Sequence, residues 1–139
     1  VRPKACEDCI VVRPGTYEEV SEILKWANKE LVPVIPRGGG TGACGAAIPT
    51  EPSVIMSMER FRKIVEVDET NMMITCQTGV TLASLNEYLA KNVHALYFPC
   101  HPGDEGAQVG GMCIENAGGV RAVNHEKLHQ RYEGLSAKW

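Results

Sequence analysis

Residues 36–42 read Pro-Arg-Gly-Gly-Gly-Thr-Gly and follow a short apolar run at 32–35. Consecutive glycines form neither a stable helix nor a stable strand. They do allow main-chain N–H groups to converge on an anion, because no Cβ atoms stand in the way. Arg37 adds a permanent positive charge at the same point. The stretch therefore indicates a loop that binds phosphate or pyrophosphate, although a flexible surface turn has the same composition.

The residues before this loop predict a strand, a helix and a second strand. An apolar run at 10–12 ends in the turn-forming sequence Arg-Pro-Gly. Thr16 and Glu19 then have the spacing of a capping box, and apolar residues follow at helical intervals to Leu31. We expect a helix over 16–31 and a strand over 32–36. By the rules for such connections, the two strands are expected to be parallel neighbours.

The middle of the chain predicts a hairpin followed by a helix. Residues 54–56 are strand-like, and strands at 64–67 and 72–76 flank a turn-forming sequence. Thr81 then precedes a stripe of leucines that runs to about residue 92, which indicates a capped helix.

A second glycine-rich segment covers residues 101–119. It has four glycines between positions 110 and 119, and this density indicates that the backbone closely approaches a ligand or another part of the chain. Two such segments with polar side chains suit an extended ligand such as a dinucleotide. A Rossmann fold is excluded, because it needs G-x-G-x-x-G between the first strand and the first helix, where this chain has Arg-Pro-Gly-Thr.

Composition narrows the class of protein further. The 139 residues carry a formal charge of −3 without a basic stripe, which argues against a nucleic-acid surface. No apolar stretch approaches the roughly 18 residues of a membrane span. Residues 1–4 are not followed by an apolar run, so we expect no signal peptide, a cytoplasmic location and six reduced cysteines. The lone Cys6-x-x-Cys9 lacks partners for a four-ligand metal site, so no metal is expected.

Six motifs in a fixed order carry a resemblance to a known family. They are V-x-R-P-G-T-x-E-E-V at 11–20, P-x-I-P-R-G-G-G-T-G at 33–42, T-G-V at 78–80, P-G at 102–103, V-G-G at 109–111 and N-A-G-G at 116–119. With these motifs the chain resembles the FAD-linked oxidases, whose flavin domain is of the vanillyl-alcohol oxidase and p-cresol methylhydroxylase type. It is most similar to the branch of glycolate oxidase and the FAD-dependent D-lactate and D-2-hydroxyglutarate dehydrogenases.

The resemblance implies an α+β FAD-binding domain in two subdomains. Residues 1–50 would form the first subdomain with the pyrophosphate loop, and residues 51–123 the second, incomplete one. The implied cofactor is noncovalent FAD, because Thr41 occupies the place at which some relatives carry a flavin-linked histidine. A Cβ on Gly119 is expected to crowd the flavin. The implied FAD-binding residues are Pro36, Arg37, Gly38, Gly39, Gly40, Thr41, Gly42, Pro102, Gly103, Asp104, Gln108, Gly110, Gly111, Asn116, Gly118, Gly119 and Val120.

Residues 124–139 depart from the family pattern and are expected to lie outside it, as a frameshifted or truncated end or as an unrelated linker or tag. They contain His125-Glu126-x-x-His129, which matches the H-E-x-x-H motif of zinc hydrolases. A zinc hydrolase is therefore a remote alternative.

The resulting interpretation is the FAD-binding portion of an oxidoreductase that oxidises a small D-2-hydroxy acid such as glycolate or D-lactate. The alternative is a non-catalytic or truncated FAD-binding fragment. No catalytic residue is assigned, because the family's substrate domain is missing from the chain. An electron-acceptor protein is an expected partner of the longer relatives. An incomplete antiparallel sheet would leave an open edge, so self-association is also expected.

Overall fold

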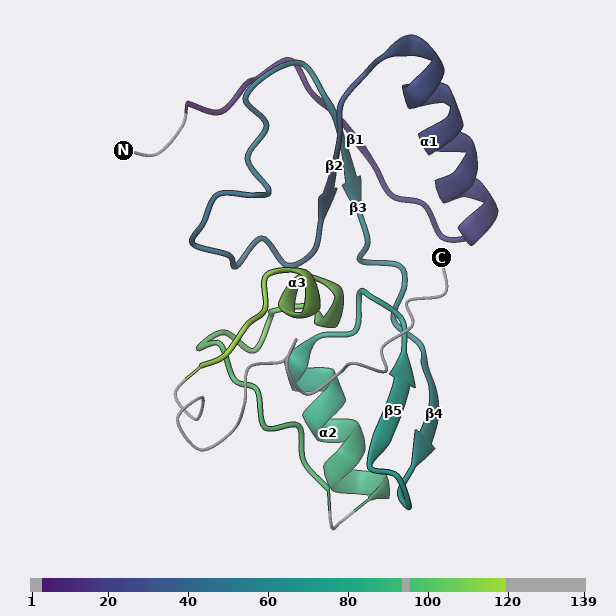
Figure 1. Ribbon diagram of the computed structural model, residues 1–139, viewed down its shortest axis with the longest axis vertical. Coiled ribbons are helices and arrows are strands. Elements are labelled where there is room, and N and C mark those ends of the chain that lie inside the picture. Colours follow the sequence, from purple (N-terminus) through teal and green to yellow (C-terminus); the bar gives the residue numbers. More distant parts are fainter. Residues whose placement is uncertain (1–3, 94–95, 120–139) are drawn as a thin grey trace.

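The computed structural model describes residues 4–93 and 96–119, and in this part of the chain helices and strands are mixed (Figure 1). The mixture agrees with the predicted α+β class. The elements, in chain order, are β1 (Ile10–Val12), α1 (Tyr17–Glu30), β2 (Val34–Arg37), β3 (Val54–Ser57), β4 (Ile64–Asp68), β5 (Met73–Cys76), α2 (Leu82–Asn92) and α3 (Val109–Ile114).

The first sheet is parallel and has the strand order β1-β3-β2. The parallel orientation of the first two strands is confirmed, but the prediction that they are neighbours is wrong. β3 lies between them, and its Ile55 faces Val11 on one side and Ile35 on the other. Burial explains this order, because Val54 and Met56 of β3 are only 4% and 5% exposed, while β1 is largely exposed at the edge.

Because β3 is the central strand of the first sheet, the predicted subdomain boundary at residue 50 would divide this sheet. We propose that the boundary follows β3, so that the first subdomain ends near residue 57. In Figure 1 the first sheet and α1 occupy the upper half of the molecule, and the hairpin and α2 occupy the lower half.

The predicted helix at 16–31 is confirmed as α1, with a small change at its start. The Thr16 hydroxyl accepts a hydrogen bond from the Glu19 N–H, as a capping residue does. The Glu19 carboxylate accepts a hydrogen bond from the N–H of Gly15, at 2.6 Å, one residue before the N-cap. Leu31 ends the helix in a left-handed conformation, with φ of 56°.

The lower half has its own core, formed by the predicted hairpin and helix. β4 and β5 pair antiparallel, and α2 begins at Leu82 after a Thr81–Ser84 capping box. Leu85 and Leu89 of α2 are buried with Val80 and Val93, and apolar residues of the hairpin pack against them. Both sequence predictions are therefore confirmed within one or two residues.

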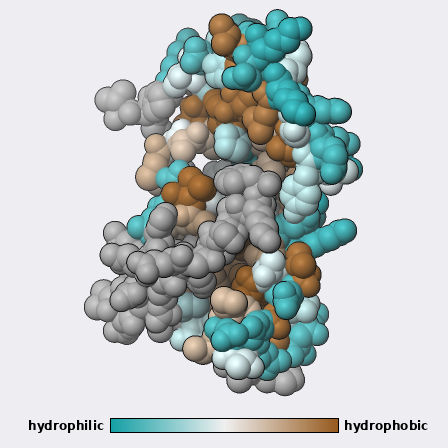
Figure 2. Space-filling model, turned by 45° about the vertical axis from the view of Figure 1, so that its right-hand side comes forward, coloured by the Kyte–Doolittle hydropathy of each residue, from teal (hydrophilic) through white to brown (hydrophobic). Residues whose placement is uncertain are grey.

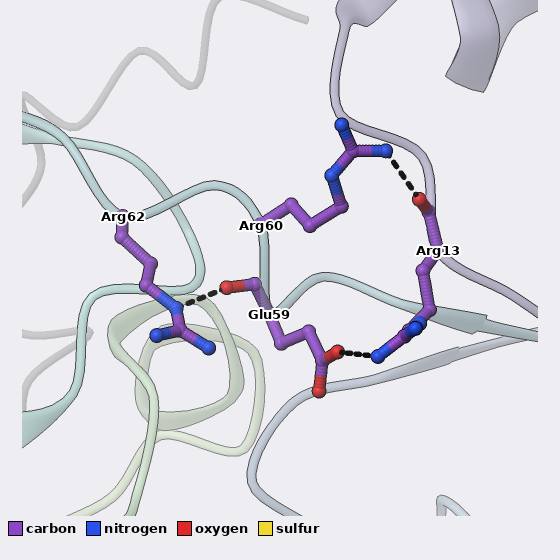
Figure 3. Close-up of polar contacts among 4 residues, drawn as sticks. All are labelled: Arg13, Glu59, Arg60 and Arg62. Atoms are coloured by element: carbon purple, nitrogen blue, oxygen red, sulfur yellow. Dashed lines mark hydrogen bonds and ion pairs between the residues drawn. The ribbon is translucent and has the colours of Figure 1, made fainter.

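Polar and aromatic contacts join the two halves at the turn between β3 and β4. The ring of Phe61, which is 2% exposed, lies 5.3 Å from the ring of Tyr17 at the start of α1. Arg60 donates a hydrogen bond to the Arg13 carbonyl, and Arg13 forms an ion pair with Glu59 at 2.8 Å (Figure 3). Exposed ion pairs contribute about 0–1 kcal/mol, so the packing of the buried Phe61 ring makes the larger contribution to this junction.

Candidate functional site

The first glycine loop, residues 38–42, begins where β2 ends. Arg37 is the last residue of β2, and its carbonyl accepts a hydrogen bond from the Met58 N–H at 3.0 Å. The loop therefore starts at the carboxyl edge of a parallel sheet, which is the edge where α/β proteins commonly bind ligands. In Figure 1 this edge faces α3, between the two halves of the molecule.

The amides of this loop have no partners within the described part of the chain. None of the N–H groups from Gly38 to Gly42 donates a hydrogen bond to another described residue. The loop is exposed except at Gly38, so these donors are accessible to a ligand. Gly40 adopts a left-handed conformation with φ of 71°, and a Cβ there would lie 2.6 Å from the Arg37 guanidinium. A cation thus folds over a loop of free donors, which is the chemistry that an anion requires.

The two glycine-rich segments, far apart in sequence, touch each other. A Cβ on Gly39 would lie 2.3 Å from the carbonyl oxygen of Gly106. A Cβ on Gly38 would lie 3.3 Å from Oε1 of Gln108. Gly39 is therefore needed for the close approach of the second segment, whereas at Gly38 the contact is with a side chain.

Two buried polar side chains flank Arg37 and Gly38. Gln108 is 8% exposed, and its Oε1 has no hydrogen-bond partner among the described residues. Ser57, paired with Arg37 in the sheet and 3% exposed, likewise has an unpartnered hydroxyl. Each unmet polar group costs about 1–3 kcal/mol, a cost that a polar ligand relieves. The sequence identified Gln108 but missed Ser57, because a serine at the end of a short strand carries no signal of its own.

The start of the second segment is fixed by α2. The carbonyls of Glu105 and Ala107 accept hydrogen bonds from the N–H groups of Ala83 and Leu82, in the first turn of α2. The same stretch thus satisfies α2 donors that lack partners inside the helix. Within the segment, the Asp104 carboxylate accepts from the Gly106 N–H at 2.7 Å. Gly106 is thereby held at the place where it meets the first loop.

The glycines at 110 and 111 do not lie in an irregular loop, because both belong to the short helix α3. A Cβ on Gly110 would lie 2.8 Å from the Cβ of Thr78, so this glycine permits helix packing. A Cβ on Gly111 would meet nothing within 4 Å. Gly103 and Gly42 are equally open, and Pro102 lies in the same exposed stretch as Gly103.

The end of the segment contacts the residues around Cys100. Asn116 has a left-handed φ of 49°, and Gly119 forms a bridge with His101. A Cβ on Gly119 would lie 2.0 Å from the His101 carbonyl oxygen. The protein's own backbone thus already requires a glycine at this position, and crowding by the flavin stays a prediction. Val120 and the motif His125-Glu126-x-x-His129 lie outside the described residues.

The loop fits a nucleotide diphosphate, because its free amides and the Arg37 guanidinium can donate to phosphate oxygens at one sheet edge. Residues 9–137 match the family model described as FAD binding domain. The chain belongs to this family of FAD-binding domains. The match extends through residue 137 and so includes most of the tail from residue 124 that was expected to lie outside the family.

Relatives with assigned names agree with this family. The chain is 46% identical over 137 residues to a D-lactate dehydrogenase of Archaeoglobus fulgidus, a match that covers 99% of this chain and 30% of that protein. It is 34% identical over 126 residues to glycolate oxidase subunit GlcD of Bacillus subtilis, covering 90% of this chain and 26% of that subunit. The structure of an alkyldihydroxyacetonephosphate synthase superimposes with a TM-score of 0.75 at 28% identity, over 86% of this chain and 24% of that one.

The chain therefore spans less than a third of the length of these relatives. FAD is the cofactor of the domain, as the family and the relatives indicate. Within the described residues there is no group of three or more His, Cys, Asp or Glu side chains that is placed to hold a metal ion.

Proposed function

We propose that this chain is the FAD-binding portion of an oxidoreductase that oxidises a small D-2-hydroxy acid such as D-lactate or glycolate. The proposal is supported by membership of the FAD-binding family and by the names of the relatives. The observation that carries it is the contact of Gly39 with Gly106, because it joins a loop of free amides to a second glycine-rich segment.

In the proposed arrangement, each part of the site has its own task. The amides of residues 38–42 hold the pyrophosphate, with Pro36 shaping the entry to the loop and Arg37 compensating the negative charge. Residues 102–111, including Gln108, line the riboflavin. Residues 116–120 pass along the edge of the isoalloxazine ring.

Bound FAD supplies the acceptor for the hydride that leaves the substrate's α-carbon. The chain's own residues bind and orient the cofactor and keep water from it. Oxidation of a hydroxy acid also needs a base for the hydroxyl proton, and no described residue is assigned that role. In the proposed function this base comes from the further length of chain that the relatives have.

The experiment is a visible absorption spectrum of the purified chain after incubation with FAD and gel filtration. We expect a flavin spectrum. Under anaerobic conditions, bleaching by D-lactate, glycolate or D-2-hydroxyglutarate, but not by L-lactate, supports the oxidoreductase. Flavin that dithionite bleaches and the acids do not supports the alternative, a non-catalytic FAD-binding fragment. A chain that retains no flavin contradicts both proposals.

We expect the flavin to be bound without a covalent link. Thr41 stands where some relatives attach FAD to a histidine, and a threonine hydroxyl does not form that bond. Acid precipitation is therefore expected to leave a colourless pellet and release all the flavin into the supernatant. A pellet that stays yellow after washing would contradict noncovalent binding.

Partners and location stay predictions of the sequence. No helix among the described residues is long and apolar enough to cross a membrane. Figure 2 shows hydrophobic residues, in brown, grouped in the upper half of the molecule, and Ile10 and Val11 of the edge strand β1 are 65% and 62% exposed. An open apolar edge favours pairing with another chain, which supports the proposed self-association. An electron-acceptor partner and a cytoplasmic location are proposed on the resemblance and the composition alone.

A further inference from the structure

The end of the second glycine-rich segment is held by a buried thiol. Cys100 is 7% exposed, and its Sγ lies 3.1 Å from the carbonyl oxygen of Ala117 and 3.3 Å from that of Gly118. The next residue, His101, forms a bridge with Gly119. Two successive residues thus hold three successive residues of the segment that the proposed function places beside the flavin.

Residues 100–101 and residues 117–119 pack so closely that no side chain fits between their backbones at position 119. Gly119 has φ of 96°, a conformation that favours glycine, and a Cβ there would lie 2.0 Å from the His101 carbonyl oxygen. Burial raises the pKa of the Cys100 thiol, so the sulfur keeps its hydrogen at neutral pH. The protonated thiol can therefore donate a hydrogen bond to the Ala117 and Gly118 carbonyls.

We propose that Cys100 is a positioning residue for FAD. The Cys100 thiol fixes the Ala117 and Gly118 carbonyls and thereby sets the path of residues 116–119 along the flavin. This inference rests on the proposed function, because it takes the flavin to lie beside that segment. A thiol hydrogen bond is weak, but it acts here on backbone that touches the ligand. Small displacements of such backbone change ligand contacts directly.

Cys113 offers a matched control. It is a half-buried thiol that packs against the same apolar cluster as Cys100, and its pKa is also raised by burial. Its sulfur makes no hydrogen bond with a described residue. Cys100→Ala and Cys113→Ala each remove one sulfur from that cluster, but only the first removes a donor to the segment. Cys100→Ser keeps a donor of similar size.

The experiment is a titration of FAD into the wild type and the three variants, read by quenching of flavin fluorescence and by the shape of the visible flavin band. We expect Cys100→Ala to weaken FAD binding about fivefold and to change the band. Cys100→Ser and Cys113→Ala are expected to stay within about twofold of the wild type. Circular dichroism and thermal unfolding establish that each variant is folded.

The outcomes separate this inference from the proposed function. Unchanged binding in Cys100→Ala overturns the inference, as does an equal loss in Cys100→Ser or Cys113→Ala, because packing alone would then explain the effect. If the wild type binds no FAD, the proposed function fails. Amide hydrogen exchange at residues 117–119 then decides whether the thiol orders the segment, and equal exchange in wild type and Cys100→Ala overturns that role.

Discussion

Replacing Gly39 with valine is expected to abolish FAD binding. At this position a Cβ would lie 2.3 Å from the Gly106 carbonyl oxygen and 3.2 Å from its carbon, both in the backbone of the second segment. Neither atom belongs to a flexible side chain, so the two glycine-rich segments must separate. Misplacing a binding loop by about an ångström costs on the order of 100-fold in function. We therefore expect at least that loss of affinity in a fluorescence titration with FAD.

A graded series makes this prediction sharper. A Cβ on Gly38 would meet the Gln108 side chain at 3.3 Å, and that side chain can shift, so Gly38→Ala is expected to weaken binding far less than Gly39→Val. Val65→Ala, at a position 67% exposed in β4, is the control and is expected to bind like the wild type. A folded Gly39→Val protein with an unchanged flavin content would refute the assignment of the loop.

The sequence predicted those parts of the fold that local signals determine. α1 and α2 begin after Thr16 and Thr81, because an N-cap hydroxyl and an apolar stripe act within a few residues of each other. The hairpin was predictable for the same reason, since the turn after Asp68 is stabilised by contacts between Asp68 and Asn71.

The strand order of the first sheet was not predictable in this way. β3 enters between β1 and β2 after a long connection, and its place depends on burial against distant residues rather than on its own sequence. Likewise, the helix α3 contains Gly110 and Gly111, which are poor helix formers. Its position follows from bonds of Val109 and Gly110 to the carbonyls of Val80 and Thr78, which no local pattern records.

The candidate site, too, has parts that local sequence predicts and parts that depend on tertiary contacts. The first glycine loop was recognisable from composition, because a run of glycines beside an arginine allows main-chain amides to converge on an anion. The partner of Gly39 was not, since Gly106 has no distinguishing neighbour in the sequence. Ser57 and the thiol of Cys100 were missed because their importance depends on burial and on contacts that only the folded chain creates.

Replacing Gly79 with alanine is expected to destabilise the fold where its two halves meet. A Cβ there would lie 2.2 Å from the Met58 carbonyl oxygen and 2.7 Å from that of Phe61. The Gly79 N–H also donates to the Phe61 carbonyl at 2.8 Å, so residue 79 cannot move away without losing this bond. Overpacking of this kind costs about 1–3 kcal/mol, and we expect a loss in the free energy of unfolding near the upper end, measured by urea titration.

Gly42→Ala is the matched control for this prediction. A Cβ on Gly42 would meet nothing within 4 Å, so this variant is expected to change the free energy of unfolding by no more than about 0.5 kcal/mol. The Gly79 variant should also lose affinity for FAD, because Met58 donates to the Arg37 carbonyl at the start of the first glycine loop. Equal stability of the two variants would mean that the turn after β3 can shift to accommodate a Cβ at position 79 without loss of free energy. In that case the junction between the halves would not hold the loop in place.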